Sequence, residues 1–507
     1  MRYPTLFGYG KGVPPPGGHE GDPSVAARTQ RVRSGFIITI LTIAVVSFSA
    51  LQSLFVPVLP QIQEQYDATQ ESVTWVLTAY LLSASVCTPL MGRIGDIVGK
   101  QRILVLTLAA LTLGSLLAAV APTLGILIFA RIVQGAGGGV MPLAFGIIRD
   151  EIADDRVGRT ISILAAIGSL GYGAGLVAAG PIVDHLGFHW LFWLPMIATA
   201  LAGAATLLVP PSPVAAPSPL PWGPAALLAL WLVLLLLALS QGNTWGWTSL
   251  AVLGLLGSSA VAAAVWAFVE ARVSTPMIDL DMMRRRGIWT SNLVATLLGF
   301  CMFAGYGFVP QLVQTPPAAG YGFGSTLTES GRMLLPSTLA MFVVGFATSS
   351  LVRTFGSRWV TSAGCLIGSA SFLALAFAHT HPWQVTIFMT TLGAGIGIVF
   401  ATLAGVVVGA VPADQTGVAS GMNANVRTIG GSLGAAVMAG LVTAHVGPSG
   451  FPQESGYVVG LLVLAIALAL AAIGSLWVPN THDQATGSPL LDADNAELGL
   501  VPMGHTR

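Results

Sequence analysis

One short stretch, GRIGDIVGKQR (92–102), gathers four charged side chains in a chain that is only 8% charged. The four are Arg93, Asp96, Lys100 and Arg102. Gly92 and Gly99 bracket the acid and allow two helices to be joined by a tight turn. An acid placed there can pair with a neighbouring helix end or an arginine, which predicts a latch that closes one face of the protein. The alternative is that the basic residues only set membrane orientation and the acid is incidental.

Two arginines, Arg131 and Arg427, lie deep within long apolar segments. An arginine at the centre of a bilayer costs about 2.5–3.5 kcal/mol on insertion scales, so each should face a cavity or a partner. Each is interpreted either as lining a central cavity or as making a structural bond, which for Arg427 would go to carbonyl groups or Asn423. Further polar side chains are expected at the same cavity or, alternatively, in bonds between helices. They are Gln52, Tyr80, Gln134, Tyr172, Asn292, Tyr306, Gln311 and Asn425.

The 21 acidic residues lie in predicted tails, loops and helix ends, and none lies deep within an apolar segment. Asp184 and Glu329 fall near the ends opposite to the 92–102 stretch. Five of the eight histidines also fall on that side, where imidazole groups can titrate between about pH 5 and 8. A role in proton uptake with Asp184 or Glu329 is one interpretation. Solvated loop histidines are the other.

Composition indicates an integral membrane protein. The 507 residues are 54% hydrophobic, and their charged content is far below the roughly 25% of soluble globular proteins. The net charge is zero and only two of 21 basic residues are lysines, so no nucleic-acid partner is expected. The three cysteines have no metal-ligand spacing, and no nucleotide-binding G-x-x-x-x-G-K-(S/T) motif occurs. We therefore expect no cofactor, no metal site and no enzyme active site.

The apolar segments have the length of membrane-spanning helices, which need about 20 residues each. Fourteen are predicted, which makes the chain an all-α membrane protein. Their ranges are 35–58, 72–92, 102–121, 124–147, 158–182, 189–209, 223–241, 249–270, 289–313, 330–351, 358–379, 383–410, 414–444 and 457–478.

The basic clusters follow even-numbered segments or precede the first, which places them on the cytoplasmic side together with both termini. The resulting division of the chain comprises a disordered cytoplasmic tail (1–33), an N-terminal six-helix bundle (34–209), a Pro-rich linker (210–222), two inserted helices (223–271), a cytoplasmic linker (272–288), a C-terminal six-helix bundle (289–478) and a second disordered cytoplasmic tail (479–507).

Three stretches of the chain resemble sequence motifs of the major facilitator superfamily. The 92–102 stretch is similar to its G-x-L-x-D-(R/K)-x-G-(R/K)-x-(R/K) loop, with Ile97 where a base is usual. The stretch LIFARIVQG is similar to its L-x-x-x-R-x-x-Q-G pattern, and SGMNANVRTIGGSLGAAV resembles a segment of fourteen-helix drug:proton antiporters. The matching residues in these two stretches are Leu127, Arg131, Gln134, Gly135, Asn423, Arg427, Gly430, Gly431 and Gly434. A weaker copy of the loop, SSLVRTFGSRW (349–359), lies 257 residues later, with Arg353 in place of the acid.

The sequence also departs from the superfamily. The usual G-x-x-x-G-P-x-x-G-G motif of the fifth helix is replaced by GYGAGLVAAGP, which keeps Gly171, Gly175 and Gly180 for close helix packing but carries Leu176 at the proline position. Leu51 occupies the place of an aspartate that antiporters of this group commonly carry in the first helix. A cavity with arginines and no deep carboxylate favours neutral or anionic amphiphiles.

The resemblance implies a major facilitator fold of two six-helix bundles plus two inserted central helices. It also implies a multidrug or antibiotic exporter of a bacterial cell membrane, coupled to protons by antiport and working by alternating access. Its partners would be a small amphipathic substrate, protons and the lipid bilayer, and it would function as a monomer. The alternatives are a dedicated exporter of one metabolite or lipid, and a facilitator without proton coupling.

Overall fold

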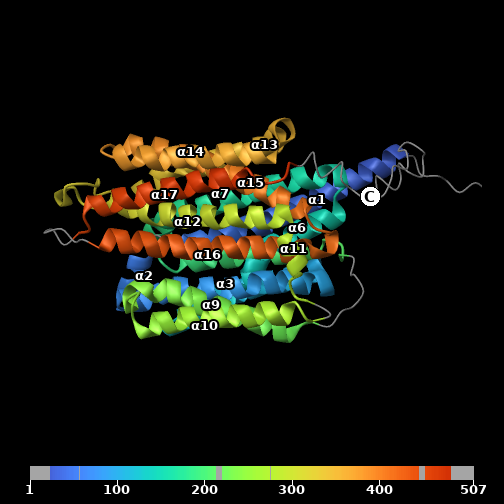
Figure 1. Ribbon diagram of the computed structural model, residues 1–507, viewed down its shortest axis with the longest axis horizontal. Coiled ribbons are helices and arrows are strands. Elements are labelled where there is room, and N and C mark those ends of the chain that lie inside the picture. Colours follow the sequence, from blue (N-terminus) through green and yellow to red (C-terminus); the bar gives the residue numbers. More distant parts are fainter. Residues whose placement is uncertain (1–22, 56–57, 213–219, 274–275, 445–450, 481–507) are drawn as a thin grey trace, which may run out of the picture.

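The computed structural model describes residues 23–55, 58–212, 220–273, 276–444 and 451–480, and these residues form helices and no strands (Figure 1). The first half holds α1 (Pro23–Leu54), α2 (Leu59–Gln65), α3 (Gln70–Val98), α4 (Lys100–Ala119), α5 (Leu124–Gln134), η1 (Gly135–Gly139), α6 (Val140–Glu151), α7 (Asp154–Leu186) and α8 (Trp190–Thr206). The inserted pair is α9 (Trp222–Trp245) and α10 (Leu250–Glu270). The second half holds α11 (Leu280–Arg284), α12 (Arg286–Gln314), η2 (Pro317–Ala319), α13 (Leu327–Phe355), α14 (Ser357–Phe377), α15 (Pro382–Gly409), η3 (Ala413–Gln415), α16 (Thr416–Thr443) and α17 (Glu454–Ser475).

Thirteen helical stretches in the described chain are long and apolar enough to cross a membrane, with α5, η1 and α6 acting as one. The predicted span that is missing from this set, 189–209, corresponds to α8, an apolar helix of 17 residues. At about 1.5 Å per residue, α8 is at the short limit for a spanning helix. The predicted 124–147 helix forms one candidate span, Leu124–Glu151, but contains a 3₁₀ segment, because the run GAGGG has low α-helix propensity.

The predicted N-terminal tail is too long. The sequence analysis placed residues 1–33 in a disordered segment, whereas α1 begins at Pro23. Proline is favoured in the first turn of a helix, and the following VAARTQRVR contains good helix formers. Residues 1–22, most of the Pro-rich linker (213–219) and residues 481–507 of the second predicted tail lie outside the described residues.

The buried apolar residues fall into three clusters. One is built almost entirely from residues 37–209 and the second almost entirely from residues 294–472. These two cores correspond to the two predicted bundles. The bundles meet along seams where α3 packs on α16 and where α7 packs on α13 and α15.

The third cluster joins the inserted pair to the second half. Leu228 and Leu232 of α9 and Trp266 of α10 share it with residues of α15 and α16. In Figure 1, α9 and α10 form the lower edge of the molecule beside α3, and α13 and α14 form the upper edge.

Helix α9 is bonded to both halves. Ser240 of α9 hydrogen-bonds Thr78 of α3 at 2.7 Å, and the Asn243 amide donates to the carbonyl of Ala436 on α16 at 2.9 Å. The segment after α10 also has a tie in each half. Arg93 donates to the carbonyl of Pro276 at 3.0 Å, and Arg285 donates to the carbonyl of Ala410 at 3.1 Å.

Candidate functional site

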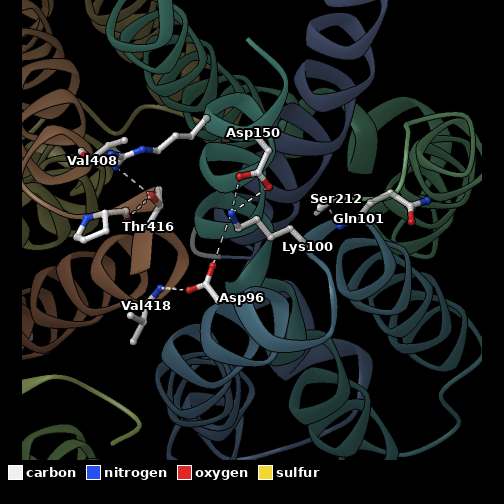
Figure 2. Close-up of polar contacts among 10 residues, drawn as sticks. Asp96, Lys100, Gln101, Asp150, Ser212, Val408, Thr416 and Val418 are labelled. Atoms are coloured by element: carbon white, nitrogen blue, oxygen red, sulfur yellow. Dashed lines mark hydrogen bonds and ion pairs between the residues drawn. The ribbon is translucent and has the colours of Figure 1, made fainter. Parts of the chain in front are cut away.

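The 92–102 stretch lies at the seam between the bundles, at what we call the latch end. Gly99 has a φ of 116°, which ends α3 and starts α4 without an intervening loop. One turn before it, an Asp96 carboxylate oxygen accepts a hydrogen bond from the backbone N–H of Val418 at 3.2 Å (Figure 2). Val418 lies in the first turn of α16, where helix N–H groups lack intrahelical partners and favour a negative charge. Asp96 therefore caps a helix of the opposite bundle.

Lys100 connects this acid to a second one. Its ammonium group donates to both carboxylate oxygens of Asp150, at 2.8 and 3.0 Å, and lies 3.9 Å from Asp96 (Figure 2). The side chains of Asp96, Lys100 and Asp150 are 1%, 5% and 8% exposed. We call these three residues, with the first turn of α16, the latch. Arg102 of the predicted set is exposed and lies outside it.

Two glycines bring the backbones together at the latch. A Cβ atom built on Gly92 would lie 2.6 Å from the carbonyl oxygen of Gly417, and one on Gly417 would lie 2.8 Å from that of Gly92. Larger residues would hold α3 and α16 apart, since real Cβ contacts are never this short.

A second tie across the seam involves a residue that the sequence analysis did not select. Arg149, at the end of α6, donates to Thr416 Oγ1 at 3.1 Å and also to the carbonyl of Val408. In the sequence, Arg149 follows a predicted span, which indicates only how the chain is oriented in the membrane. Nothing in the neighbouring sequence identifies the helices that Arg149 contacts.

Arg131 is fully buried within the first bundle. Its guanidinium carbon lies 4.1 Å from the ring centroid of Phe55 and 4.2 Å from that of Tyr80. It donates to the carbonyl of Val76 at 3.2 Å and to Gln134 at 2.7 Å, and Gln134 donates in turn to Ser115 at 3.0 Å. Neither Arg131 nor Gln134 lines the central cavities described below, so here they form a bonded network between helices.

Arg427 instead lines two adjoining cavities between the bundles. The cavities have volumes of about 30 and 60 Å³ and share Met141, Phe400 and Arg427. The guanidinium carbon lies 4.5 Å from the centroid of the Phe400 ring. The larger cavity combines polar and apolar side chains, and among the residues that the structure assigns to its wall Arg427 is the single charged one. The others include Phe48, Ser49, Gln52, Ser169, Tyr172, Met302, Phe303, Met341 and Thr428.

Of the other polar residues predicted at the cavity, some line it and some lie in contacts between helices. Asn423 lines the smaller cavity, and its amide donates to Asn292 at 2.9 Å. Tyr306 is buried, hydrogen-bonds Ser337 at 3.0 Å and belongs to the wall of neither cavity. Asn425 is 1% exposed, and neither of its amide atoms finds a hydrogen-bond partner within the described chain.

The predicted proton-linked acids lie at the end opposite to the latch. Asp184 accepts a hydrogen bond from Thr328 at 2.8 Å, which joins α7 to the start of α13. Glu329 belongs to a capping box with Thr326, in which each side chain bonds the backbone N–H of the other. Both acids therefore have local structural partners.

The predicted packing glycines all lie at close helix contacts. Gly171 and Gly175 face α1, and a Cβ on Gly180 would lie 2.7 Å from Thr328 of α13. Gly430 and Gly434 face backbone carbonyls of α12, and a Cβ on Gly431 would lie 2.7 Å from Phe303. No cluster of three or more histidine, cysteine or acidic residues that could hold a metal ion occurs in the described ranges.

The sequence model of the Major Facilitator Superfamily matches residues 41–435. The tetracenomycin C resistance and export protein of Streptomyces glaucescens is 28% identical over 424 residues, which are 82% of this chain and 77% of that protein. The uridine/deoxyuridine transporter of Lactococcus lactis is 28% identical over 464 residues, which are 88% of this chain and 95% of that protein.

The chain spans about 60% of the length of uncharacterized MFS-type transporters of Mycobacterium tuberculosis that it also matches. Among solved structures, the human organic anion transporter MFSD10 superposes with a TM-score of 0.65 and 16% identity, over 87% of this chain and 99% of that one. At this identity the superposition supports the fold alone.

Proposed function

Since the chain belongs to the Major Facilitator Superfamily, we propose that this membrane transporter exports small amphipathic molecules that are neutral or anionic. The observation that carries the proposal is the wall of the larger central cavity. Phenylalanine and methionine side chains there suit an apolar body, because methionine adapts to varied shapes. Arg427 and the neighbouring hydroxyl and amide groups suit a polar or negative end. A cationic substrate would meet the guanidinium without a carboxylate to balance it.

The proposed mechanism is alternating access by rocking of the two bundles. A cavity of about 60 Å³ is far smaller than the roughly 300–1,000 Å³ of sites that hold drug-sized ligands. Substrate loading therefore requires the bundles to separate, and at the latch end this means parting Asp96 from the N-terminus of α16. The latch end and both termini are proposed to lie in the cytoplasm of a bacterial cell, which the positive-inside pattern supports. Reporter tags fused after residues 285 and 480 should then both remain inside.

Proton-coupled antiport is part of the proposal and is supported by the resemblance to drug:proton antiporters. Asp184 and Glu329 are the proposed proton-linked groups. Asp184 is the better placed of the two, because its bond to Thr328 connects the bundles at the end opposite to the latch. Protonation would weaken that bond by removing the charge of the acceptor.

Counterflow in proteoliposomes tests this function. We expect a neutral and an anionic amphiphile to be transported, a quaternary ammonium dye to be transported poorly, and an imposed pH gradient to accelerate uptake. Arg427→Gln should reduce transport of the anion about tenfold and that of the neutral compound less, whereas Arg427→Lys should keep part of the anion transport. Arg284→Gln removes an exposed arginine at the latch end and is the matched control. Preferred transport of the dye would contradict the proposal.

A dedicated transporter of one polar metabolite is the second candidate. It is favoured by the extent of the match to the uridine/deoxyuridine transporter and by the amides of Gln52 and Asn423 at the cavities. Uridine added to the same vesicles separates the two functions. Saturable uridine counterflow without transport of amphiphiles would favour the dedicated transporter.

A further inference from the structure

A separate cavity of about 630 Å³ opens at the latch end, away from the latch itself. It lies where the first turns of α7, the last turns of α13 and the end of α15 come together. These helices contribute Arg156 and Arg159, Ser349 and Arg353, and Thr402 and Gly405, respectively. It is about ten times larger than the central cavity with Arg427 and shares no residue with it. The mechanism proposed above makes no use of it.

The wall of this cavity is suited to an anion. Arg156, Arg159 and Arg353 bring three guanidinium groups to the wall from two helices of opposite bundles, and Arg353 also donates to Ser350 at 3.2 Å. Ser162, Ser349 and Thr402 add hydroxyl groups. Guanidinium groups donate several hydrogen bonds in a planar fork, a geometry that matches phosphate oxygens.

One face of α13 leads from the lipid-exposed surface into the cavity. Val343 and Phe346 are 62% and 41% exposed on a helix with the composition of a membrane span. Ser349 and Arg353 follow Phe346 at spacings of three and seven residues, so all four side chains lie along the same side of the helix. Arg353 and Arg156 lie near the ends of their helices. In helices that span a membrane, such positions would lie close to the phospholipid headgroups.

We propose that this cavity binds the phosphate headgroup of an anionic phospholipid, with an acyl chain lying over Val343 and Phe346. Basic pockets between helices at the membrane surface are suited to such headgroups, because the anionic surface and the apolar chain contribute together. The bound headgroup would lie between α7 and α13, which belong to opposite bundles. Lipid composition would therefore influence how readily the bundles move apart at this end.

Native mass spectrometry of the purified full-length protein tests the proposal without any transported substrate. Phosphatidylglycerol and phosphatidylcholine with the same acyl chains are added in equal amounts. We expect at least fivefold more phosphatidylglycerol to be retained by the wild type, and a ratio within twofold for Arg159→Gln/Arg353→Gln. Arg159→Lys/Arg353→Lys should keep most of the preference, because the charge remains.

The matched control is Arg272→Gln/Arg284→Gln, which removes two exposed arginines at the same end but outside the cavity. It should retain the wild-type ratio, and circular dichroism checks that each variant is folded. Equal retention of the two lipids by the wild type would overturn the proposal, as would the same loss of preference in the control. Displacement of phosphatidylglycerol by an equimolar amount of soluble glycerol 3-phosphate would overturn the assignment to a lipid.

Discussion

The α3–α4 and α13–α14 connections are two versions of one turn with opposite electrostatics. Each is a single glycine with positive φ, Gly99 at 116° and Gly356 at 81°. In each, the start of the second helix is tied to chain that follows the last helix of its own bundle. The backbone N–H of Gln101 donates to Ser212 Oγ at 3.3 Å, and the Ser357 hydroxyl donates to the carbonyl of Pro479 at 2.6 Å.

The residue three positions before the glycine separates the two turns. In the first it is Asp96, which caps α16 and holds a packed seam at the latch. In the second it is Arg353, which lines the 630 Å³ cavity beside α7. The same glycine turn therefore accompanies a closed contact where the residue three positions before it is an acid that caps a helix N-terminus. It accompanies an open basic cavity where that residue is an arginine. Side-chain charge, more than backbone shape, therefore distinguishes the two seams.

The largest effect is expected for Lys100→Met. It leaves the carboxylates of Asp96 and Asp150 buried without their shared cation, and breaking a buried ion pair in this way costs about 3–5 kcal/mol. A detergent thermal-unfolding assay should show a large drop in stability. Arg358→Met, at the second turn, should change stability much less. Equal losses in the two variants would contradict the difference between the turns.

Gly417→Val should be next in size. The added side chain would collide with the Gly92 carbonyl and the Asp96 carboxylate, and overpacking of this kind costs about 1–3 kcal/mol. Since the collision occurs only when the seam is closed, a cysteine introduced at Ala424 beside the smaller cavity should react faster with a maleimide added at the latch end. Gly254→Val has open space around the new side chain and should leave labelling unchanged.

Asp96→Asn should have a smaller effect in the same labelling assay. The amide still accepts the bond from Val418 but loses the charge that interacts with the α16 terminus and Lys100, an effect of about 1 kcal/mol. We expect labelling of Ala424→Cys to rise about fivefold. Asp281→Asn, which neutralises an exposed acid at the same end, is the control. Unchanged labelling in Asp96→Asn would show that the carboxylate does not hold the seam.

Arg353→Asp should have the smallest effect on the latch. It gives the second turn the acid of the first, but this residue faces a cavity instead of a packed helix start. Labelling of Ala424→Cys should stay within about twofold of the wild type, because the charge lies outside the α3–α16 seam. A change as large as that in Asp96→Asn would mean that the two turns are interchangeable.

Much of this architecture could be predicted from the sequence. Long apolar segments identify helices because a membrane requires them, and glycine spacing around Asp96 identifies a tight turn. The motif residues Gly92, Asp96 and Lys100 meet at the seam, and Gln52, Tyr172, Asn423 and Arg427 line the cavities.

The partners of these residues could not be predicted. Asp96 and Val418 are 322 positions apart, and a sequence pattern gives the face of each helix without specifying which face it meets. For the same reason Arg131 and Arg427 look alike in sequence. The structure separates them, because Phe55 and Tyr80 enclose Arg131 while the neighbours of Arg427 leave space.

The inserted helix pair has a mechanical consequence. Because α9 is bonded to Thr78 in one bundle and Ala436 in the other, and the segment after α10 reaches Arg93 and Ala410, the pair bridges the same α3–α16 seam on its membrane side. In the proposed rocking of the bundles, the pair would move with only one of them and slide along the other. Its hydrogen bonds to both bundles would then limit how far the bundles separate, and a twelve-helix relative without the pair would lack this restraint.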